Sequence, residues 1–336
     1  MKATLLLTTC LFFIHFGHSQ NLVLDGGLED TLKCPASIGR FYHPTNTNEQ
    51  YTAQWRSTTL ASPDYHHVCG YNNYQANTGK GHAGILYYDP TEYREYITAL
   101  LSEPLVAGET YYYEYYVALH SNSTVATAEM QIHFSAGVPL DQSFPPPGPY
   151  ALTPHVQSAV TPTSTFYQPI SGCFVATGGE DAMTFGNFND NANTNLTTVS
   201  ATGQVNSYYY LDNVSLFHMD STLSTTNDTI WANMAGASYQ WVDCDNGNAS
   251  INGETNQYFT PTAAGNYAVV ITMGGCSITS ACVLIDIFGV EELSNGPKKL
   301  IQIVDLMGRE TTYKPNTPLI YIYDDGSRER VFRLEL

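Results

Sequence analysis

The chain has 336 residues, more than one hydrophobic core usually organises, so we expect two or three domains. Charged residues make up only 13% of it, against about 25% in ordinary soluble proteins. The 25 tyrosines, 26 glycines and 17 prolines favour an all-β extracellular protein. The formal net charge is −18, and residues 95–297 contain no Lys or Arg. Such a stretch cannot neutralise phosphates, which excludes nucleic acid and anionic membranes as partners of the body of the protein.

The first 19 residues predict a secretory signal peptide. Lys2 supplies the positive charge, residues 5–16 form the apolar run, and a small-x-small pattern ends at Ser19, so cleavage exposes Gln20. No later segment approaches the roughly 20 apolar residues of a membrane span. We therefore expect a mature chain without a transmembrane segment, outside the cell or on its outer surface.

Six cysteines follow the predicted signal peptide. In an exported protein they predict disulfides, and none has the C-x-x-C spacing of a zinc or redox site. We expect Cys34 to pair with Cys69, and one further pair among the last three cysteines: Cys244, Cys276 and Cys282. The sequence leaves the partner of Cys173 open.

Residues 20–218 predict a β-sandwich of short alternating strands. The clearest strand covers residues 111–119, where Tyr111, Tyr113, Tyr115, Val117 and Leu119 share one face. Residues 129–135 and 207–217 show similar alternation. The proline-rich segment 144–149 is expected to leave the sheet, because proline cannot donate ladder hydrogen bonds.

Two smaller β units are expected after a polar break at residues 220–227. Residues 222–287 predict an immunoglobulin-like sandwich, since a strand with Trp241 at its centre is followed by a strand with Tyr267 in the position of a tyrosine corner. Residues 288–336 predict a linker and a small β-module with strands at 300–306, 319–323 and 330–334, and a turn at Asp325-Gly326.

Three segments resemble known families. The tail, with Val304-Asp305-Leu306-Met307-Gly308-Arg309 and Leu319-Ile320-Tyr321-Ile322-Tyr323, resembles a shortened C-terminal sorting domain of type IX secretion cargo. Residues 222–287, with Tyr239-Gln240-Trp241, resemble the immunoglobulin-like spacers that precede such tails. Residues 20–218, with Gly81-His82-Ala83-Gly84-Ile85 and Leu211-Asp212-Asn213-Val214, resemble galactose-binding-like jelly rolls of secreted surface proteins. These resemblances imply export by the type IX machinery.

The jelly-roll resemblance also implies a structural calcium ion. In such jelly rolls the positions of Glu29, Asp212 and the turn at Lys80 usually meet around one ion, with Asp25 as a further candidate ligand. Calcium takes six to eight oxygen ligands, which an acidic exported domain can supply. The alternative is that these are ordinary turn and edge carboxylates.

We do not expect catalysis or a transition metal. His66 and His67 are adjacent on a strand and so point to opposite faces. The carboxylate pairs Glu92 with Glu95, and Glu180 with Asp181, have no spacing that fixes the separation a glycosidase needs. No nucleophile or metalloprotease motif occurs in the sequence.

Aromatic residues between positions 42 and 88 favour sugar binding by stacking. Tyr74 is among the loop residues that could stack, and the selected candidates are Trp55, Tyr65, Tyr71 and Tyr87, although such residues also pack beneath long loops. We therefore expect a secreted binding protein whose jelly roll recognises an extracellular polysaccharide or glycoconjugate. The alternatives are a secreted hydrolase with its site in residues 30–90 or 136–200, and a structural adhesin without a small ligand. Convergent carboxylates in a deep cleft would favour the hydrolase.

Overall fold

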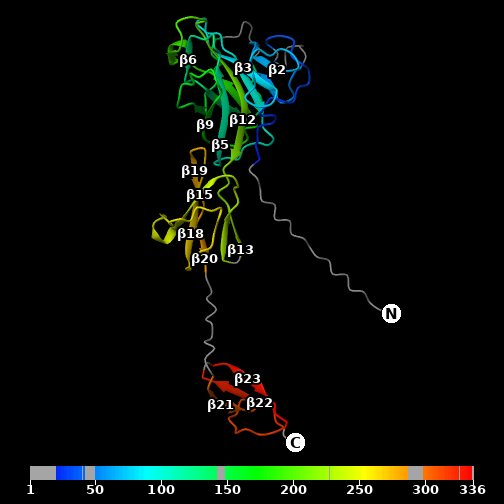
Figure 1. Ribbon diagram of the computed structural model, residues 1–336, viewed down its shortest axis with the longest axis vertical. Helices are drawn as coiled ribbons and strands as arrows, with labels where there is room; N and C mark the ends of the chain where they lie inside the picture. Colours follow the sequence, from blue (N-terminus) through cyan, green and yellow to red (C-terminus); the bar gives the residue numbers. More distant parts are fainter. Residues whose placement is uncertain are drawn as a thin grey trace, which may run out of the picture. The chain divides into compact units, whose positions relative to one another are not determined.

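The computed structural model describes residues 20–39, 41, 50–141, 148–226, 228–286, 298–324 and 326–334. The expected signal peptide, most of the proline-rich segment at 144–149, the linker up to residue 297 and Asp325 of the expected turn lie outside these ranges. The chain divides into two compact units, the first ending at Ile285 and the second beginning at Asp286. Strands dominate both units, so the all-β prediction is confirmed (Figure 1).

Two five-stranded antiparallel sheets form the first sandwich. The first sheet has the order β1-β4-β10-β7-β8, with bounds Trp55–Ser57, Ile97–Leu100, Ala182–Gly186, Gln131–Ser135 and Val156–Gln157. The second has the order β2-β3-β12-β5-β9, with bounds Asp64–His67, Gly81–Tyr88, Ser207–His218, Thr110–Leu119 and Gln168–Val175. A small pair, β6 (Val125–Thr127) with β11 (Leu196–Thr198), and the 3-10 turn η1 (Asn191–Asn193) complete this jelly-roll sandwich.

The core lies between these two sheets. The predicted face of β5 is buried, with Tyr111, Tyr113, Tyr115, Val117 and Leu119 each at most 4% exposed. Tyr115 meets Phe185 of the opposite sheet edge-on, with ring centroids 5.3 Å apart. The alternation that predicted β5 therefore identifies the inner face of the second sheet correctly.

Two glycines allow close packing on the outer side of this sheet. A Cβ on Gly84 of β3 would lie 1.8 Å from the Tyr208 hydroxyl, so only glycine leaves room for that tyrosine ring. A Cβ on Gly70 would lie 2.1 Å from the carbonyl oxygen of Pro35. The segment after β2 thus lies so close to the backbone of Pro35 that a side chain at position 70 would clash with it.

Residues 223–285 form the second, immunoglobulin-like sandwich. One sheet contains β13 (Leu223–Thr226), β14 (Thr229–Ala232) and β17 (Tyr258–Phe259). The other contains β16 (Ala249–Ser250), β15 (Ser238–Asp243), β18 (Gly265–Met273), β19 (Cys276–Thr279) and β20 (Val283–Ile285), with the 3-10 turn η2 (Cys244–Asn246).

The sequence prediction for this sandwich is confirmed at its core and corrected at its start. Trp241 is fully buried, and the Tyr267 hydroxyl donates to the Ala263 carbonyl at 2.9 Å, as in a tyrosine corner. The break expected at residues 220–227 is wrong in part, because residues 223–226 pair with β14 as a strand.

Three disulfides are present. Cys34–Cys69 confirms the first predicted pair, and Cys244–Cys282 is the pair expected among the last three cysteines. Cys173 of β9, whose partner the sequence left open, bonds to Cys276 of β19. This third disulfide joins the jelly roll covalently to the second sandwich.

The second compact unit contains the three expected C-terminal strands. They are β21 (Leu300–Val304), β22 (Leu319–Tyr323) and β23 (Arg328–Val331), paired antiparallel in that order (Figure 1). Of their large apolar side chains, Val304 and Leu319 are buried. Among the described residues of the whole chain, no helix has the length and apolar character required to span a membrane.

Candidate functional site

The structure buries three of the four aromatic residues expected to stack on sugars. Trp55, Tyr65 and Tyr87 are each 0% exposed and belong to the core between the sheets. The Trp55 Nε1 donates to the Asp25 carbonyl at 2.8 Å, and the Tyr65 hydroxyl donates to the Leu28 carbonyl at 3.1 Å. The predicted exposed platform is therefore wrong at these three positions, because a ring packed on both sides offers no face to a sugar.

Tyr71, the fourth candidate, is partly exposed and lies on the outer side of the second sheet. Its ring centroid is 5.1 Å from that of His66, which points outward because its neighbour Tyr65 points inward. The Tyr71 amide donates to the Pro35 carbonyl at 2.6 Å, and Asn73 Nδ2 donates to the Tyr71 hydroxyl at 3.3 Å. Tyr71 is thus held in place at the surface and remains a candidate for stacking on a sugar.

Aromatic rings and histidines cover this outer face. His66 of β2 and His82 of β3 are register partners whose rings stack with centroids 4.7 Å apart and planes at 3°. Tyr210 of β12 meets both edge-on, at 5.6 and 5.5 Å. Tyr74 stacks on Tyr210 at 4.2 Å. We call the connected set the tyrosine–histidine face; it comprises His66, Tyr71, Tyr74, His82, His120, Tyr167, Tyr208 and Tyr210.

The face has a buried layer and a partly exposed layer. His66, His82 and Tyr210 are buried, whereas the remaining five members are partly exposed. Phe166, next to Tyr167 in the chain, is 79% exposed. A molecule that approaches this side of the jelly roll therefore meets tyrosine rings first and imidazoles beneath them.

A half-buried carboxylate, that of Asp64, adjoins the face. The Tyr208 hydroxyl donates to Asp64 Oδ2 at 2.6 Å and lies 3.4 Å from His66 Nε2, while the Gly39 amide donates to Asp64 Oδ1 at 2.7 Å. Burial raises the pKa of Asp64, and the hydrogen bond from Tyr208 opposes that rise. Asp64 thus orients the Tyr208 hydroxyl.

Several buried polar atoms of the face have no hydrogen-bond partner among the described residues. They are His66 Nδ1, both ring nitrogens of His82 and the Tyr167 hydroxyl. Burial lowers the pKa of His66 to about 4 and that of His82 to about 3, so both imidazoles are neutral at neutral pH. A neutral imidazole offers one donor and one acceptor, but both rings are 0% exposed, so a ligand at the surface does not contact them in this structure.

Two of the predicted calcium ligands bind one turn. Asp212 Oδ2 accepts from the amides of residues 77 and 78 at 2.8 and 3.1 Å. Glu29 Oε1 accepts from the amides of residues 80 and 81 at 2.7 and 3.1 Å. The carbonyl of Lys80 accepts from the Val68 amide at 3.1 Å. Glu29, Asp212 and Lys80 therefore meet at one turn, as predicted. The two carboxylates bind backbone amides of that turn.

Asp25 lies beside this turn region and is similarly engaged. Its two carboxylate oxygens accept from the amides of Glu29 and Asp30 at 2.7 and 3.0 Å. Burial raises the pKa of Asp25 to about 6 and that of Asp212 to about 7. In the part of the chain that the structure describes, no three His, Cys, Asp or Glu side chains are grouped as metal ligands. Calcium at these residues stays a prediction.

The carboxylates considered for hydrolysis each accept from the backbone amide of a different segment. Glu95 is buried, and its oxygens accept from the Leu86 amide at 2.9 Å and from Ser62 Oγ at 3.3 Å. Burial, followed by the nearby Asp64, raises the pKa of Glu95 to about 8. Glu180 caps its own loop by accepting from the Thr177 amide at 2.8 Å.

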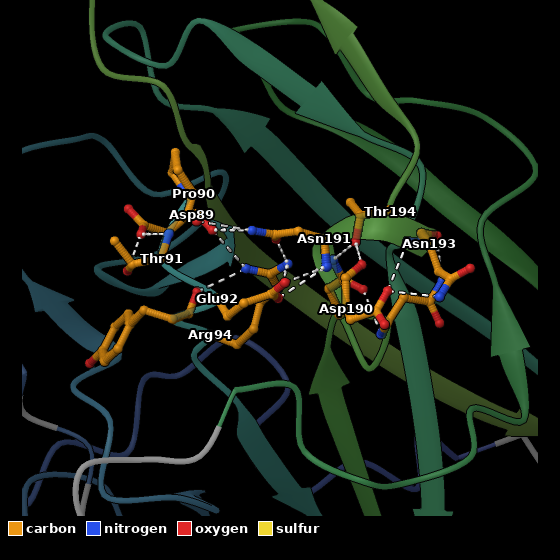
Figure 2. Close-up of polar contacts among 12 residues, drawn as sticks. Asp89, Pro90, Thr91, Glu92, Arg94, Asp190, Asn191, Asn193 and Thr194 are labelled. Atoms are coloured by element: carbon orange, nitrogen blue, oxygen red, sulfur yellow. Dashed lines mark hydrogen bonds and ion pairs between the residues drawn. The ribbon is translucent and has the colours of Figure 1, made fainter.

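Glu92 belongs to a separate structural network, which Figure 2 shows. Both of its oxygens accept from the Asn191 amide at 3.0 Å. The buried Arg94 donates to the Asn191 side-chain oxygen at 2.5 Å and to the carbonyls of Tyr93 and Asp89 at 3.0 and 3.3 Å. These contacts fasten residues 89–94 to the η1 turn, so Glu92 and Arg94 have a structural role (Figure 2).

Most of the tyrosine–histidine face was missed in the sequence. The expectation that His66 and His67 do not share a site is confirmed, since His66 stacks on His82 while His67 Nδ1 lies 2.9 Å from Cys69 Sγ. The residues missed as sugar-binding candidates are His82, His120, Tyr167, Tyr208 and Tyr210. Alternation about Tyr209 would have placed Tyr208 and Tyr210 on one face, but not the partners that reach them from other strands.

Comparisons with known proteins add little to this geometry. No protein-family model matches the chain, and no curated protein matches it. Among solved structures, the chain is similar to the CBM22-1 xylan-binding domain of Paenibacillus barcinonensis Xyn10C, at 15% identity and a TM-score of 0.30, over 56% of this chain and 99% of that one. It is also similar to the baseplate tripod (BppUct-A-L) of bacteriophage Tuc2009, at 8% identity and a TM-score of 0.24, over 80% and 90%. Both TM-scores are below 0.5, so neither similarity indicates a function for this chain.

Proposed function

We propose that the protein binds a neutral extracellular polysaccharide through the tyrosine–histidine face and does not cleave it. The observation that carries this proposal is the grouping of partly exposed tyrosine rings, with Tyr71 and Tyr74 at its centre, on one outer face of the jelly roll. Flat aromatic rings pack on the apolar C–H faces of sugars.

Charge favours a neutral ligand. The members of the face contribute no Lys or Arg, and its charged neighbour Asp64 is acidic. The whole stretch from residue 95 to residue 297 contains no cation. An anionic polysaccharide would meet repulsion without a compensating cation, whereas a neutral one would not.

Binding without cleavage is favoured by the carboxylates. Glycoside hydrolysis needs two carboxyl groups facing one bond, one of them ionised. Glu95 is buried and bonded to the backbone, and Glu92 is engaged with Asn191. The hydrolase alternative therefore has less support than the binding protein.

Export, calcium and the sorting tail belong to the same proposal. Three disulfides suit an oxidising compartment outside the cytoplasm. The three-stranded tail would serve as a shortened type IX sorting domain. Calcium would stabilise the turn at residues 77–81. Mass spectrometry of secreted material should show Gln20 at the N-terminus and loss of residues after about 290. A retained Leu336 would contradict the sorting role.

The binding proposal is tested by affinity electrophoresis of the chain from residue 20 onward. The gels contain hydroxyethylcellulose, xylan, galactomannan or anionic polygalacturonate. We expect retardation by at least one neutral polymer, none by polygalacturonate, and no release of reducing ends. Retardation should weaken in Tyr74→Ala and persist in the control Val106→Ala, which removes an exposed apolar side chain outside the face. Release of reducing ends would favour the hydrolase, and absence of retardation in all neutral gels would favour the adhesin.

A further inference from the structure

A second exposed aromatic pair lies on the other sandwich. Trp231 of β14 and Tyr258 of β17 are register partners, with ring centroids 4.8 Å apart and planes at 37°. Tyr258 is 46% exposed and Trp231 is partly exposed. Their neighbours Ile230 and Phe259 are buried, so the aromatic pair lies on the outer face of the sheet.

Uncharged polar groups surround this pair. By alternation, Ser224, Thr229 and Asn233 share its face. Ser224 Oγ donates to Asn233 Oδ1 at 2.7 Å, and the hydroxyls of Thr229 and Thr260 are 2.9 Å apart. None of the three strands β13, β14 and β17 contains a charged residue. The outer face thus combines two flat rings with hydroxyl and amide groups.

The size and chemistry of this surface fit a sugar chain better than a protein partner. Aromatic side chains bury about 150–250 Å² each, so two rings supply far less than the roughly 800 Å² that a stable protein interface buries on each partner. Stacking needs only a ring or two, with hydroxyls at the rim to bond the sugar. The absence of charge on the three strands matches a neutral polymer.

We infer that Trp231 and Tyr258 form a second platform for neutral polysaccharide, separate from the tyrosine–histidine face. The inference takes its ligand class from the proposed function, but its residues are independent of that face. The Cys173–Cys276 disulfide keeps both sandwiches in one covalently closed body. Two weak sites on one body bind a long polymer more tightly than either alone, because the second contact is intramolecular.

Tryptophan fluorescence isolates the second platform without mutation. The chain contains three tryptophans, and Trp55 and Trp241 are each 0% exposed, which leaves Trp231 as the one that acrylamide should quench. The probes are hydroxyethylcellulose, xylan and galactomannan, each used whether or not it retards the chain in the gels. At saturation at least one of them should shift the emission of Trp231 and at least halve the quenching. Trp231→Phe should remove the quenchable component, and this signal with it.

Retardation gives the second readout. Tyr258→Ala should weaken binding of the long polymer by about fivefold or more, the value of one stacked ring. The control Leu284→Ala, which removes a side chain that is 66% exposed in the same sandwich, should bind like wild type. If the polymer still protects Trp231 from acrylamide in the Tyr74→Ala variant, the two sites bind independently. Undiminished quenching at saturation, or wild-type binding by folded Tyr258→Ala, would overturn the second platform while leaving the first untouched.

Discussion

Buried titratable side chains make the free energy of unfolding depend on pH in opposite directions. Burial holds the pKa of Glu95 near 8, above its unfolded value, so its stabilising contribution is lost as the pH rises toward 8. His66 and His82 have lowered pKa values, so the unfolded chain binds more protons below about pH 6.5 and stability falls as the pH drops. Between about pH 4.5 and 6.5 the contributions of Glu95 and of the two histidines to the free energy of unfolding therefore change in opposite directions.

Glu95→Gln tests the loss of stability that Glu95 causes as the pH rises toward 8. Because glutamine mimics the protonated acid, the variant should lack the decline in the free energy of unfolding that Glu95 causes between pH 4.5 and 8. Its stability relative to wild type should rise by a few kcal/mol across that window, measured by urea unfolding at pH 5, 6.5 and 8. Parallel pH profiles of the two proteins would show that Glu95 ionises normally in the folded chain.

Trp55 and Tyr71 should respond differently to truncation. Trp55→Ala removes a ring that is 0% exposed, and such changes cost about 3–5 kcal/mol of unfolding free energy. Tyr71→Ala removes a partly exposed ring and should cost less than about 1 kcal/mol while weakening polysaccharide retention. Urea titration and affinity electrophoresis of both variants measure these effects. A stable Trp55→Ala protein that has lost retention would restore Trp55 as a binding residue.

The sequence predicts where the strands lie better than it predicts which face of a strand points into the core. Period-two alternation located the strands at 111–119 and 207–217 because one side of each is apolar. It did not decide that Tyr65 and Tyr87 point inward, since tyrosine suits either side of a sheet. The pairing of His66 with His82 needs the register of two strands, which no local pattern contains. Cys173 likewise finds its partner 103 residues away in another sandwich.

The link between β9 and β19 is the element most open to test. Non-reducing peptide mapping of the intact chain should recover Cys173 and Cys276 in one linked peptide. Replacing both with serine should lower the unfolding free energy by about 2–4 kcal/mol. Proteolytic cleavage between residues 219 and 228 should then separate the two sandwiches, which stay linked in wild type. A peptide that links Cys173 to Cys244 or Cys282 instead would contradict this arrangement.

The turn at residues 77–81 gives the calcium test. A site absent from the unfolded chain stabilises the fold by about 2.7 kcal/mol at a hundredfold excess of ion over Kd. The melting temperature should therefore be higher in millimolar calcium than in EDTA, and Asp212→Ala should abolish the difference. Glu180→Gln, a carboxylate outside the turn, is the matched control. Identical melting of wild type in both buffers would mean that Glu29 and Asp212 hold the turn through amide hydrogen bonds alone.

For the whole molecule, composition indicated the class of protein, whereas the proposed place of binding rests on the structure. The lack of cations from residue 95 to residue 297 already excluded nucleic acid, and the cysteines indicated export. The sequence-based platform nevertheless failed at Trp55, Tyr65 and Tyr87, because burial depends on which sheet covers a strand. The tyrosine–histidine face replaces it, with Tyr71 as the shared residue.

The affinity of one double variant is the most direct test of polysaccharide binding at the tyrosine–histidine face. Tyr71→Ala with Tyr74→Ala removes two partly exposed rings and leaves the buried histidines in place. Isothermal titration with an oligosaccharide of the retarding polymer should show a Kd raised at least about tenfold, since each ring contributes roughly 1 kcal/mol. The melting temperature and the Val106→Ala control should change little. Wild-type affinity in a folded double variant would contradict polysaccharide binding at the tyrosine–histidine face.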